Sequence, residues 1–129
     1  MTLRAATVML PLHLQNEVIH PDGQIRAGFG DDLKARAHFV DAALKSLKAA
    51  STSDIPRVFV RMAFQVGGTD LPDNCELYRF VKRNEIMREG SWGAEFFDCL
   101  APDKPSDITV SHNRVNACLL YTSPSPRDG

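Results

Sequence analysis

The sequence predicts an α/β fold built on a parallel sheet. Two apolar segments of strand length, residues 7–12 and 57–64, are separated by one long amphipathic helical pattern, and a third short apolar segment follows at 107–111. Strands that alternate with helices are typical of βαβ units, in which consecutive strands run parallel. The length of 129 residues allows one domain.

The first strand is expected at residues 7–12, a nearly continuous apolar run that is interrupted only by Pro11. A run without polar alternation is typical of a strand that is buried on both faces, as in parallel sheets. Because proline has no N–H to donate, we expect the strand to loosen or end at Pro11.

A helix is expected next, with Asp31 or Asp32 as its N-cap. The helix is expected to stop near residues 51–54. Apolar side chains spaced three and four residues apart predict one buried face. The residues of this predicted stripe are Leu33, Ala37, Val40, Leu44 and Leu47, and the charged residues Lys34, Arg36, Asp41, Lys45 and Lys48 are expected mainly to face water.

The second half of the chain has shorter elements, separated by Gly and Pro. The second strand, residues 57–64, carries apolar side chains at most positions. The expected elements that follow are a surface loop at 65–74, a short helical or irregular segment through residue 81, a Gly-punctuated turn at 90–94, a short helix at 95–100 and a third strand at 107–111.

Composition excludes several classes of protein. A net charge of -1 provides no electrostatic footprint for nucleic acid or an anionic membrane surface. No apolar run approaches the ~20 residues that span a bilayer, and residues 8–12 are too short for a signal peptide. The odd number of cysteines suits a reducing compartment, so we expect a cytoplasmic protein.

The composition changes abruptly at Cys118. Residues 118–129 include Ser-Pro-Ser-Pro and Arg-Asp-Gly and lack core-forming side chains near their end, which is typical of a disordered tail. Residues 118–128 resemble one translated reading frame of a sequencing adaptor. We therefore expect an incomplete domain at 1–117 and a non-native tail at 118–129; a flexible native tail is the alternative.

Three motifs, each after the expected element, resemble the isochorismatase-like cysteine hydrolase family. They are Leu-Gln-Asn-Glu at 14–17, Gly-Ser-Trp-Gly-Ala-Glu at 90–95 and Ser-His-Asn-Arg-Val-Asn-Ala at 111–117. The resemblance covers nearly all of residues 1–117. It implies a doubly wound, mostly parallel sheet in a Rossmann-like three-layer sandwich, truncated here at its C-terminal side. It also implies a ligand site at the carboxyl ends of the strands.

The resemblance also implies a catalytic triad of Asp, Lys and Cys. In this sequence His13 stands where the family has its Asp, and His112 stands where the family has its Lys. The family's Cys follows a later strand, outside this chain. Because imidazole can deprotonate a thiol, His13 and His112 are the candidate catalytic residues. The alternative is that both are polar strand-end residues bonded to nearby backbone.

Five further residues are candidates for substrate binding. Gln15 and Asn16 follow the first strand and alternatively satisfy a turn. Trp92 could wall an apolar pocket, or simply pack. Arg114 could clamp a carboxylate, and its alternative is a solvent-facing or dimer-facing position. Asn116 completes the set.

No metal or other cofactor is expected. Nicotinamidases of the same superfamily carry an Asp-x-His-x-His cluster after the second strand, but residues 65–70 contain no His. No glycine-rich loop directly follows a strand, so nothing indicates a nucleotide. Cys75 has no basic neighbour in sequence, Cys99 is expected to be buried, and Cys118 belongs to the suspected adaptor, so none is a candidate nucleophile.

The resemblance implies that the full-length protein is a hydrolase of a small amide- or carboxylate-bearing molecule, with a cysteine nucleophile missing from this chain, so the fragment itself is expected to be inactive. A homo-oligomer is expected for the full-length protein. Replacement of two triad residues supports an alternative, a non-catalytic family member that binds a small molecule or serves assembly. A resemblance limited to the fold is the third possibility.

Overall fold

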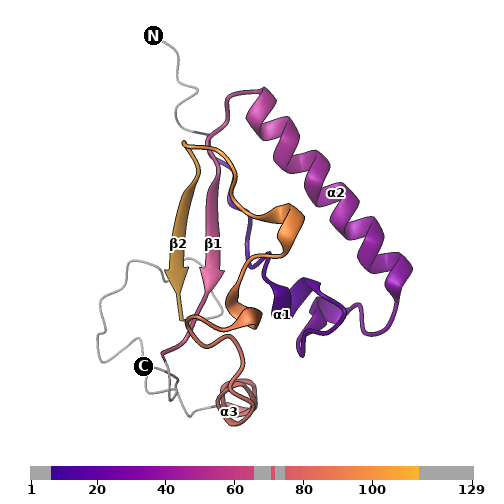
Figure 1. Cartoon of the computed structure of the whole chain (residues 1–129), viewed down its shortest axis with the longest axis vertical. Helices are drawn as coiled ribbons and strands as arrows, with labels where there is room; N and C mark the ends of the chain where they lie inside the picture. Colours follow the sequence, from indigo (N-terminus) through magenta and orange to yellow (C-terminus); the bar gives the residue numbers. More distant parts are fainter. Residues whose placement is uncertain (1–6, 66–70, 72–74, 114–129) are drawn as a thin grey trace.

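The structure, a computed structural model, describes residues 7–65, 71 and 75–113. In Figure 1, α2 runs along one side of the two strands, and α3 lies beyond their carboxyl ends. The elements, in chain order, are α1 (Asn16–Ile19), the 3-10 turn η2 (Arg26–Gly28), α2 (Leu33–Thr52), β1 (Val58–Met62), α3 (Glu76–Arg83), the 3-10 turns η3 (Trp92–Ala94) and η4 (Asp98–Leu100), and β2 (Ile108–His112).

The two strands pair in parallel, as the sequence predicts. The register runs from Val58 opposite Ile108 to Met62 opposite His112. β1 is shorter than the predicted segment 57–64, because beyond Met62 only an isolated bridge between Phe64 and Arg88 continues the pairing. The carboxyl ends of both strands therefore lie together at one edge of the sheet.

The prediction of a regular first strand buried on both faces is wrong for residues 7–12. This segment pairs with β1 in parallel through isolated bridges only. Met9 donates its backbone N–H to the Pro56 carbonyl just before β1, and His13 donates to the Val60 carbonyl. Pro11 has no N–H with which to make the intervening bond, so the ladder is broken there. Alternate side chains are also exposed: Val8 by 47%, Leu10 by 52% and Leu12 by 46%.

Helix α2 begins as predicted, since the Asp32 side chain accepts a hydrogen bond from the N–H of Ala35 at 2.9 Å. Two residues of the predicted stripe, Val40 and Leu47, are on the packed side of the helix, but the prediction is wrong for Leu33, Ala37 and Leu44. Leu33 is 63% exposed and Leu44 is 39% exposed. The side of α2 that is buried against the rest of the chain comprises Arg36, Phe39, Val40, Ala43, Leu47 and Ala50.

The prediction that Arg36 of α2 faces water is wrong. It is only 4% exposed. Its Nε donates to the Ile19 carbonyl at 2.7 Å, its Nη2 donates to the Gly30 carbonyl at 3.1 Å, and its guanidinium lies over the ring of Phe29. Arg36 therefore fixes the α1-to-α2 connection to the helix, a role that periodicity alone does not reveal.

The predicted short helix at 95–100 is also wrong. The chain forms two 3-10 turns, η3 and η4, with extended backbone between them. This extended stretch pairs with residues 14–16: Asn16 donates its N–H to the Glu95 carbonyl, and Phe97 donates to the Leu14 carbonyl. Because the backbone at 95–97 is used in this antiparallel contact, it cannot form helical hydrogen bonds.

Two apolar clusters hold these elements together. Phe59 and Leu47, both buried, belong to the cluster between α2 and one face of the sheet. Met62, Phe64 and Val81 belong to the cluster at the carboxyl end of β1. Within the described residues, α2 covers the face of the sheet that carries Phe59, while Met62 on the opposite face belongs to the same cluster as Val81 of α3. The three-layer arrangement stays a prediction.

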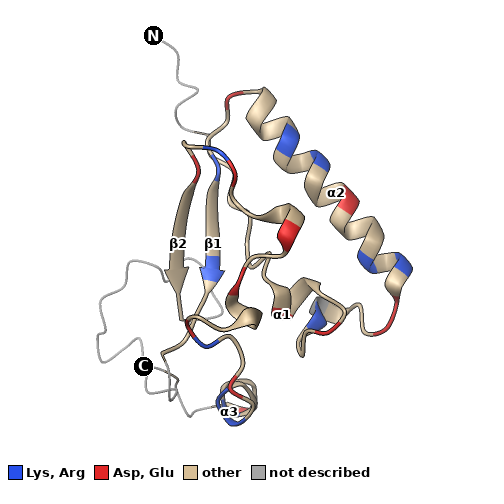
Figure 2. Cartoon of the chain, viewed as in Figure 1, with Lys and Arg blue, Asp and Glu red and all other residues tan. Residues whose placement is uncertain are grey.

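The opposite face of the sheet is covered only in part by the described chain, because Val60 and Met62 on this face are buried whereas Leu10 and Leu12 are about half exposed. Partners in a parallel pair lie on the same face, and this face includes Leu12 with Val60, and Val58 with Ile108. Ile108 is 53% exposed. Figure 2 shows basic and acidic residues spread over helices and loops rather than gathered in one patch. No helix within the described ranges is long and apolar enough to cross a membrane.

Candidate functional site

His13 and His112 meet at the carboxyl ends of the parallel strands. The two Nε2 atoms are 2.7 Å apart, although the residues are 99 positions apart in sequence. His112 is the last residue of β2, and His13 follows the bridge between Leu12 and Val60. His13 has a left-handed backbone, with φ of 57°, a conformation that costs free energy in a non-glycine residue and that Arg26, Asp54, Glu85 and Met87 also adopt.

The rings of this histidine pair face each other edge to edge. Their planes differ by 14°, and their centroids are 4.9 Å apart. The centroid separation exceeds the nitrogen separation by roughly two ring radii, so both nitrogens lie close to the line between the centroids. A hydrogen bond in this geometry needs one Nε2–H donor and one Nε2 lone pair, so the two rings have opposite tautomers.

Burial shifts the acid–base equilibria of both imidazoles in the same direction. It lowers the pKa of His13 below 6.5, and it lowers the pKa of His112 from 6.5 to about 4, with a smaller contribution from repulsion by a charged His13. The pair is therefore neutral at neutral pH. A neutral pair differs from the oppositely charged Asp and Lys that the resemblance implies at these positions.

Gln15 is fully buried, at 0% exposed, and its amide is bonded entirely to backbone. Its Nε2 donates to the carbonyls of Met62 and Ala94, and its Oε1 accepts from the N–H of Met62. Both amide donors are thereby used. Gln15 therefore positions the end of β1, a role that the sequence did not predict, and its role in substrate binding stays a prediction.

Asn16 and Trp92 lie together on the neighbouring loops. Asn16 donates from Nδ2 to the Trp92 carbonyl at 2.9 Å. The Trp92 side chain is exposed, and its ring lies edge-on to His20 with 4.9 Å between centroids. The contacts of Trp92 thus connect η3 to α1 and to the loop at His20, and its binding role stays a prediction. Arg114 and Asn116 lie outside the described residues.

Two buried charged residues near this region were missed by sequence reasoning. Glu17 is 6% exposed, and its Oε1 accepts from the N–H of Gln24 at 2.7 Å. Arg88 is 8% exposed, and its Nη2 donates to the Lys82 carbonyl, while its Nε and Nη1 are buried without a hydrogen-bond partner. Glu17 stands within the Leu-Gln-Asn-Glu motif, a signal that could have drawn attention to it; Arg88 has no such signal.

Among the described residues, the cysteines and acidic side chains form no second candidate site besides the histidine pair. Cys99 is exposed, which contradicts its expected burial, and Cys75 is partly buried. Across residues 7–65, 71 and 75–113, no three His, Cys, Asp or Glu side chains lie together in a way that could hold a metal ion. Most of the loop at 65–70 lies outside the described residues.

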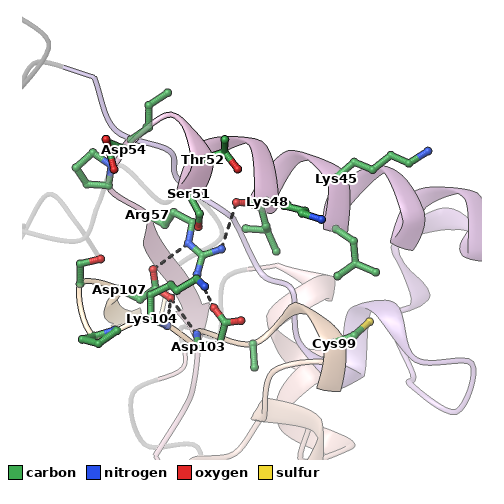
Figure 3. A pocket seen from close by; sticks show the side chains of 17 residues that line it. Lys45, Lys48, Ser51, Thr52, Asp54, Arg57, Cys99, Asp103, Lys104 and Asp107 are labelled. Carbon is green, nitrogen blue, oxygen red and sulfur yellow. Dashed lines mark hydrogen bonds and ion pairs between the residues drawn. The ribbon is translucent and has the colours of Figure 1, made fainter.

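A groove of about 880 Å³ lies at the opposite end of the sheet, between α2 and the loop before β2 (Figure 3). Arg57 and Asp107, which directly precede the two strands, are at its base. Arg57 is already bonded to Asp103, Asp107 and the Leu47 carbonyl. The histidine pair is about 16 Å away along the strands, at ~3.3 Å per residue. Ligands of open α/β sheets bind at the carboxyl ends of the strands, so the pair, not this groove, is the candidate site.

Comparison with protein families decides the classification of the chain. Residues 7–123 match the Isochorismatase domain. The chain belongs to this family. The match extends into the segment 118–129, which lies outside the described residues, so the predicted boundary after residue 117 stays a prediction. No curated protein sequence matches the chain.

Solved structures of isochorismatase-like hydrolases share the fold. A cysteine hydrolase from Pseudomonas syringae pv. phaseolicola matches with a TM-score of 0.65 and 20% identity, covering 87% of this chain and 48% of that one. N-carbamoylsarcosine amidase from Thermoplasma acidophilum matches with a TM-score of 0.58 and 20% identity, covering 83% and 51%. An isochorismatase-like hydrolase from Alkaliphilus metalliredigens matches with a TM-score of 0.53 and 17% identity, covering 84% and 52%.

The isochorismatase domain is therefore represented here in part. The chain spans about half the length of these solved structures. At such low identity the likeness shows the fold alone. The exposed apolar face of the sheet, with Leu10, Leu12 and Ile108, is consistent with a fragment of a longer α/β domain.

Proposed function

We propose that the complete domain is a hydrolase of a small amide- or carboxylate-bearing molecule. A cysteine outside this chain would be the nucleophile, and His13 and His112 would line the site. The observation that carries this proposal is the 2.7 Å contact between the two imidazoles at the carboxyl ends of the strands. His13 and His112, which stand where the family has its Asp and its Lys, are thus in contact with each other.

The chemistry that this pair offers is proton transfer. A neutral imidazole accepts the proton of a cysteine S–H, and the resulting thiolate attacks the carbonyl carbon of an amide. When the C–N bond breaks, the histidine pair supplies a proton to the departing amine. Water then hydrolyses the thioester and restores the thiol. Because burial lowers the pKa of both imidazoles, one of them is available as a base at neutral pH.

The first test is to read the source gene beyond the codon for Asn116. The proposal expects the frame to continue through another strand into a Gly-rich turn that contains a cysteine. If the gene encodes residues 118–129 and then stops, the adaptor interpretation is wrong, and the protein is a half-domain that needs a partner.

The second test is alkylation of the full-length protein with iodoacetamide. The hydrolase proposal expects alkylation to abolish hydrolysis, with N-carbamoylsarcosine as the initial probe because an amidase of that compound shares the fold. Replacement of the turn cysteine by Ala is the matched variant, and it must lose activity to the same extent. Activity that survives both treatments contradicts a cysteine mechanism.

A second candidate function is a non-catalytic module that binds a small molecule or serves assembly. The replacement of both a carboxylate and an ammonium group by neutral imidazoles favours it, because these two fixed charges are lost from the site. Absence of the cysteine from the full gene, together with binding of a small amide without turnover, would favour this candidate over the hydrolase.

A further inference from the structure

The outer nitrogens of the histidine pair have different surroundings. His112 is 8% exposed, and its Nδ1 is buried with no hydrogen-bond partner. His13 is partly exposed, and no hydrogen bond within the described structure engages its Nδ1. The inner nitrogens, both Nε2, share the hydrogen bond of 2.7 Å. The pair thus forms a continuous line from a buried nitrogen to a partly exposed ring.

We propose that His13 and His112 form a proton relay that moves a proton from the buried Nδ1 of His112 to solvent at Nδ1 of His13. The proposal deepens the proposed function, and it rests on that function for the origin of the proton, the thiol of the nucleophile. The unpartnered Nδ1 of His112 is the atom that receives it. His13 is then a positioning and relay residue rather than the base that meets the thiol.

The protons balance at every nitrogen. Before transfer, His13 carries its proton on Nδ1, and His112 carries its proton on Nε2 and donates it to Nε2 of His13. A proton arrives at Nδ1 of His112, the proton on Nε2 of His112 moves to Nε2 of His13, and the proton on Nδ1 of His13 leaves to solvent. Both rings are neutral before and after, with their tautomers exchanged. No oxidant, metal or other reactant is needed.

This starting tautomer follows from the cost of burial. If Nδ1 of His112 carried a proton, the pair would bury an N–H donor without an acceptor, which is rarer in proteins than an under-satisfied acceptor. A bare lone pair at this position is also what a base requires. Burial favours the neutral form of each ring, in agreement with a relay whose resting states are uncharged.

The relay can be tested on the 129-residue chain without knowledge of its substrate. In a sample labelled with nitrogen-15 in its histidines, we expect scalar coupling between the two Nε2 atoms and opposite tautomers of the two rings. In D2O, the ring proton of His112 should exchange about 100-fold more slowly in His13→Gln, the lower end of what a positioned proton-transfer group contributes. Added imidazole should restore exchange in His13→Gly, since His13 is at the partly exposed end.

His38 provides the matched control, because it is an exposed histidine on α2. His38→Gln should leave the coupling and the exchange rate of His112 unchanged. Absence of nitrogen–nitrogen coupling in the unmodified chain, or unchanged or faster exchange in His13→Gln, overturns the relay. These outcomes are separate from hydrolysis by the full-length protein. Coupling in the 129-residue chain with no turnover by the full-length protein overturns only the proposed function, and turnover by the full-length protein without coupling overturns only the relay.

Discussion

The side-chain amide of Gln15 pairs with the backbone of Met62 as a neighbouring strand would. Oε1 accepts from the Met62 N–H at 2.8 Å, and Nε2 donates to the Met62 carbonyl at 2.7 Å. Two residues earlier on β1, Val60 forms an isolated bridge with Leu12. The amide therefore continues the ladder after the chain has turned away at His13, and it fixes the register partner of His112.

Gln15→Met tests whether the hydrogen bonds of the Gln15 amide stabilise the end of β1. The substitution retains much of the side-chain volume, but it leaves the N–H and C=O of Met62 and the C=O of Ala94 buried without their partner. At about 1 kcal/mol for each unsatisfied group, the free energy of unfolding should fall by roughly 3 kcal/mol. Urea unfolding measures it. Gln24→Met, at an exposed position, is the control and should change stability little. Equal losses of unfolding free energy in the two variants would show that the Gln15 hydrogen bonds do not stabilise the fold.

A second prediction concerns the pH dependence of stability. His112 has a pKa of about 4 in the folded chain and an ordinary value of 6.5. Between these values the unfolded chain binds a proton that the folded chain does not, so stability is complete above pH 6.5 and is lost as pH falls toward 4. The slope reaches about 1.4 kcal/mol per pH unit for one proton.

Urea unfolding of the unmodified chain and of His112→Gln at several pH values in this window checks the pH prediction. The variant lacks the titrating ring, so its stability should depend less steeply on pH. His38→Gln, which leaves the pair intact, should retain the slope that the pair contributes. A slope that is the same in His112→Gln and the unmodified chain would show that His112 does not titrate in this way.

The sequence predicts strands and the long helix because their signals are local. Asp32 caps α2 as expected, and the strands at 58–62 and 108–112 fall within one residue or two of the predicted apolar segments. These signals depend on side chains adjacent in sequence or one helical turn apart. His13 and His112 became candidates through the family resemblance, and the structure joins them at the carboxyl ends of the paired segments.

The elements that the sequence mispredicts are those that depend on distant partners. Arg36 is polar by type, but carbonyls of Ile19 and Gly30 allow it to be buried. A helix is predicted at 95–100, but the backbone at 95–97 pairs with residues 14–16 instead. The opposite tautomers of the histidine pair depend on a contact across 99 residues, which no local pattern contains.

The ion pair between Arg57 and Asp107 joins the beginnings of the two strands. The two side chains are 6% and 3% exposed, and Nη2 of Arg57 lies 2.5 Å from Oδ2 of Asp107. Asp107→Asn should reduce the free energy of unfolding by about 3 kcal/mol, because it leaves a buried guanidinium with only Asp103 as a charged partner. Asp103→Asn is the control, since Asp103 is 69% exposed, and it should cost less than about 1 kcal/mol.

The same ion pair predicts a separate transition in acid. Hydrogen bonding to Arg57 lowers the pKa of Asp107 from 3.8 to about 2. The unfolded chain therefore takes up this proton first, so the stability contributed by the carboxylate is present above pH 3.8 and is lost as pH falls toward 2. Thermal unfolding between pH 2 and pH 4.5 should show a steeper decline in the unmodified chain than in Asp107→Asn; parallel declines would contradict the assignment.

Gly93→Ala tests the contact between η3 and α1. A Cβ at Gly93 would overlap Oε2 of Glu17 and lie 2.9 Å from its Cδ, and Gly93 has no left-handed backbone that would add strain of its own. Glu17 is buried and held by the N–H of Gln24, so it has little freedom to move away. We expect a loss of about 1 to 3 kcal/mol in the free energy of unfolding.

A double-mutant cycle with Glu17→Ala separates this overlap from other effects of Gly93→Ala. Removing the carboxylate opens the space that the new methyl group needs, so the double variant should lose less stability than the two single variants together, by at least about 0.5 kcal/mol. The cycle can be followed by urea unfolding, with the m-value as a check on the compactness of each state. Strict additivity would show that Glu17 is not the group that excludes a side chain at position 93.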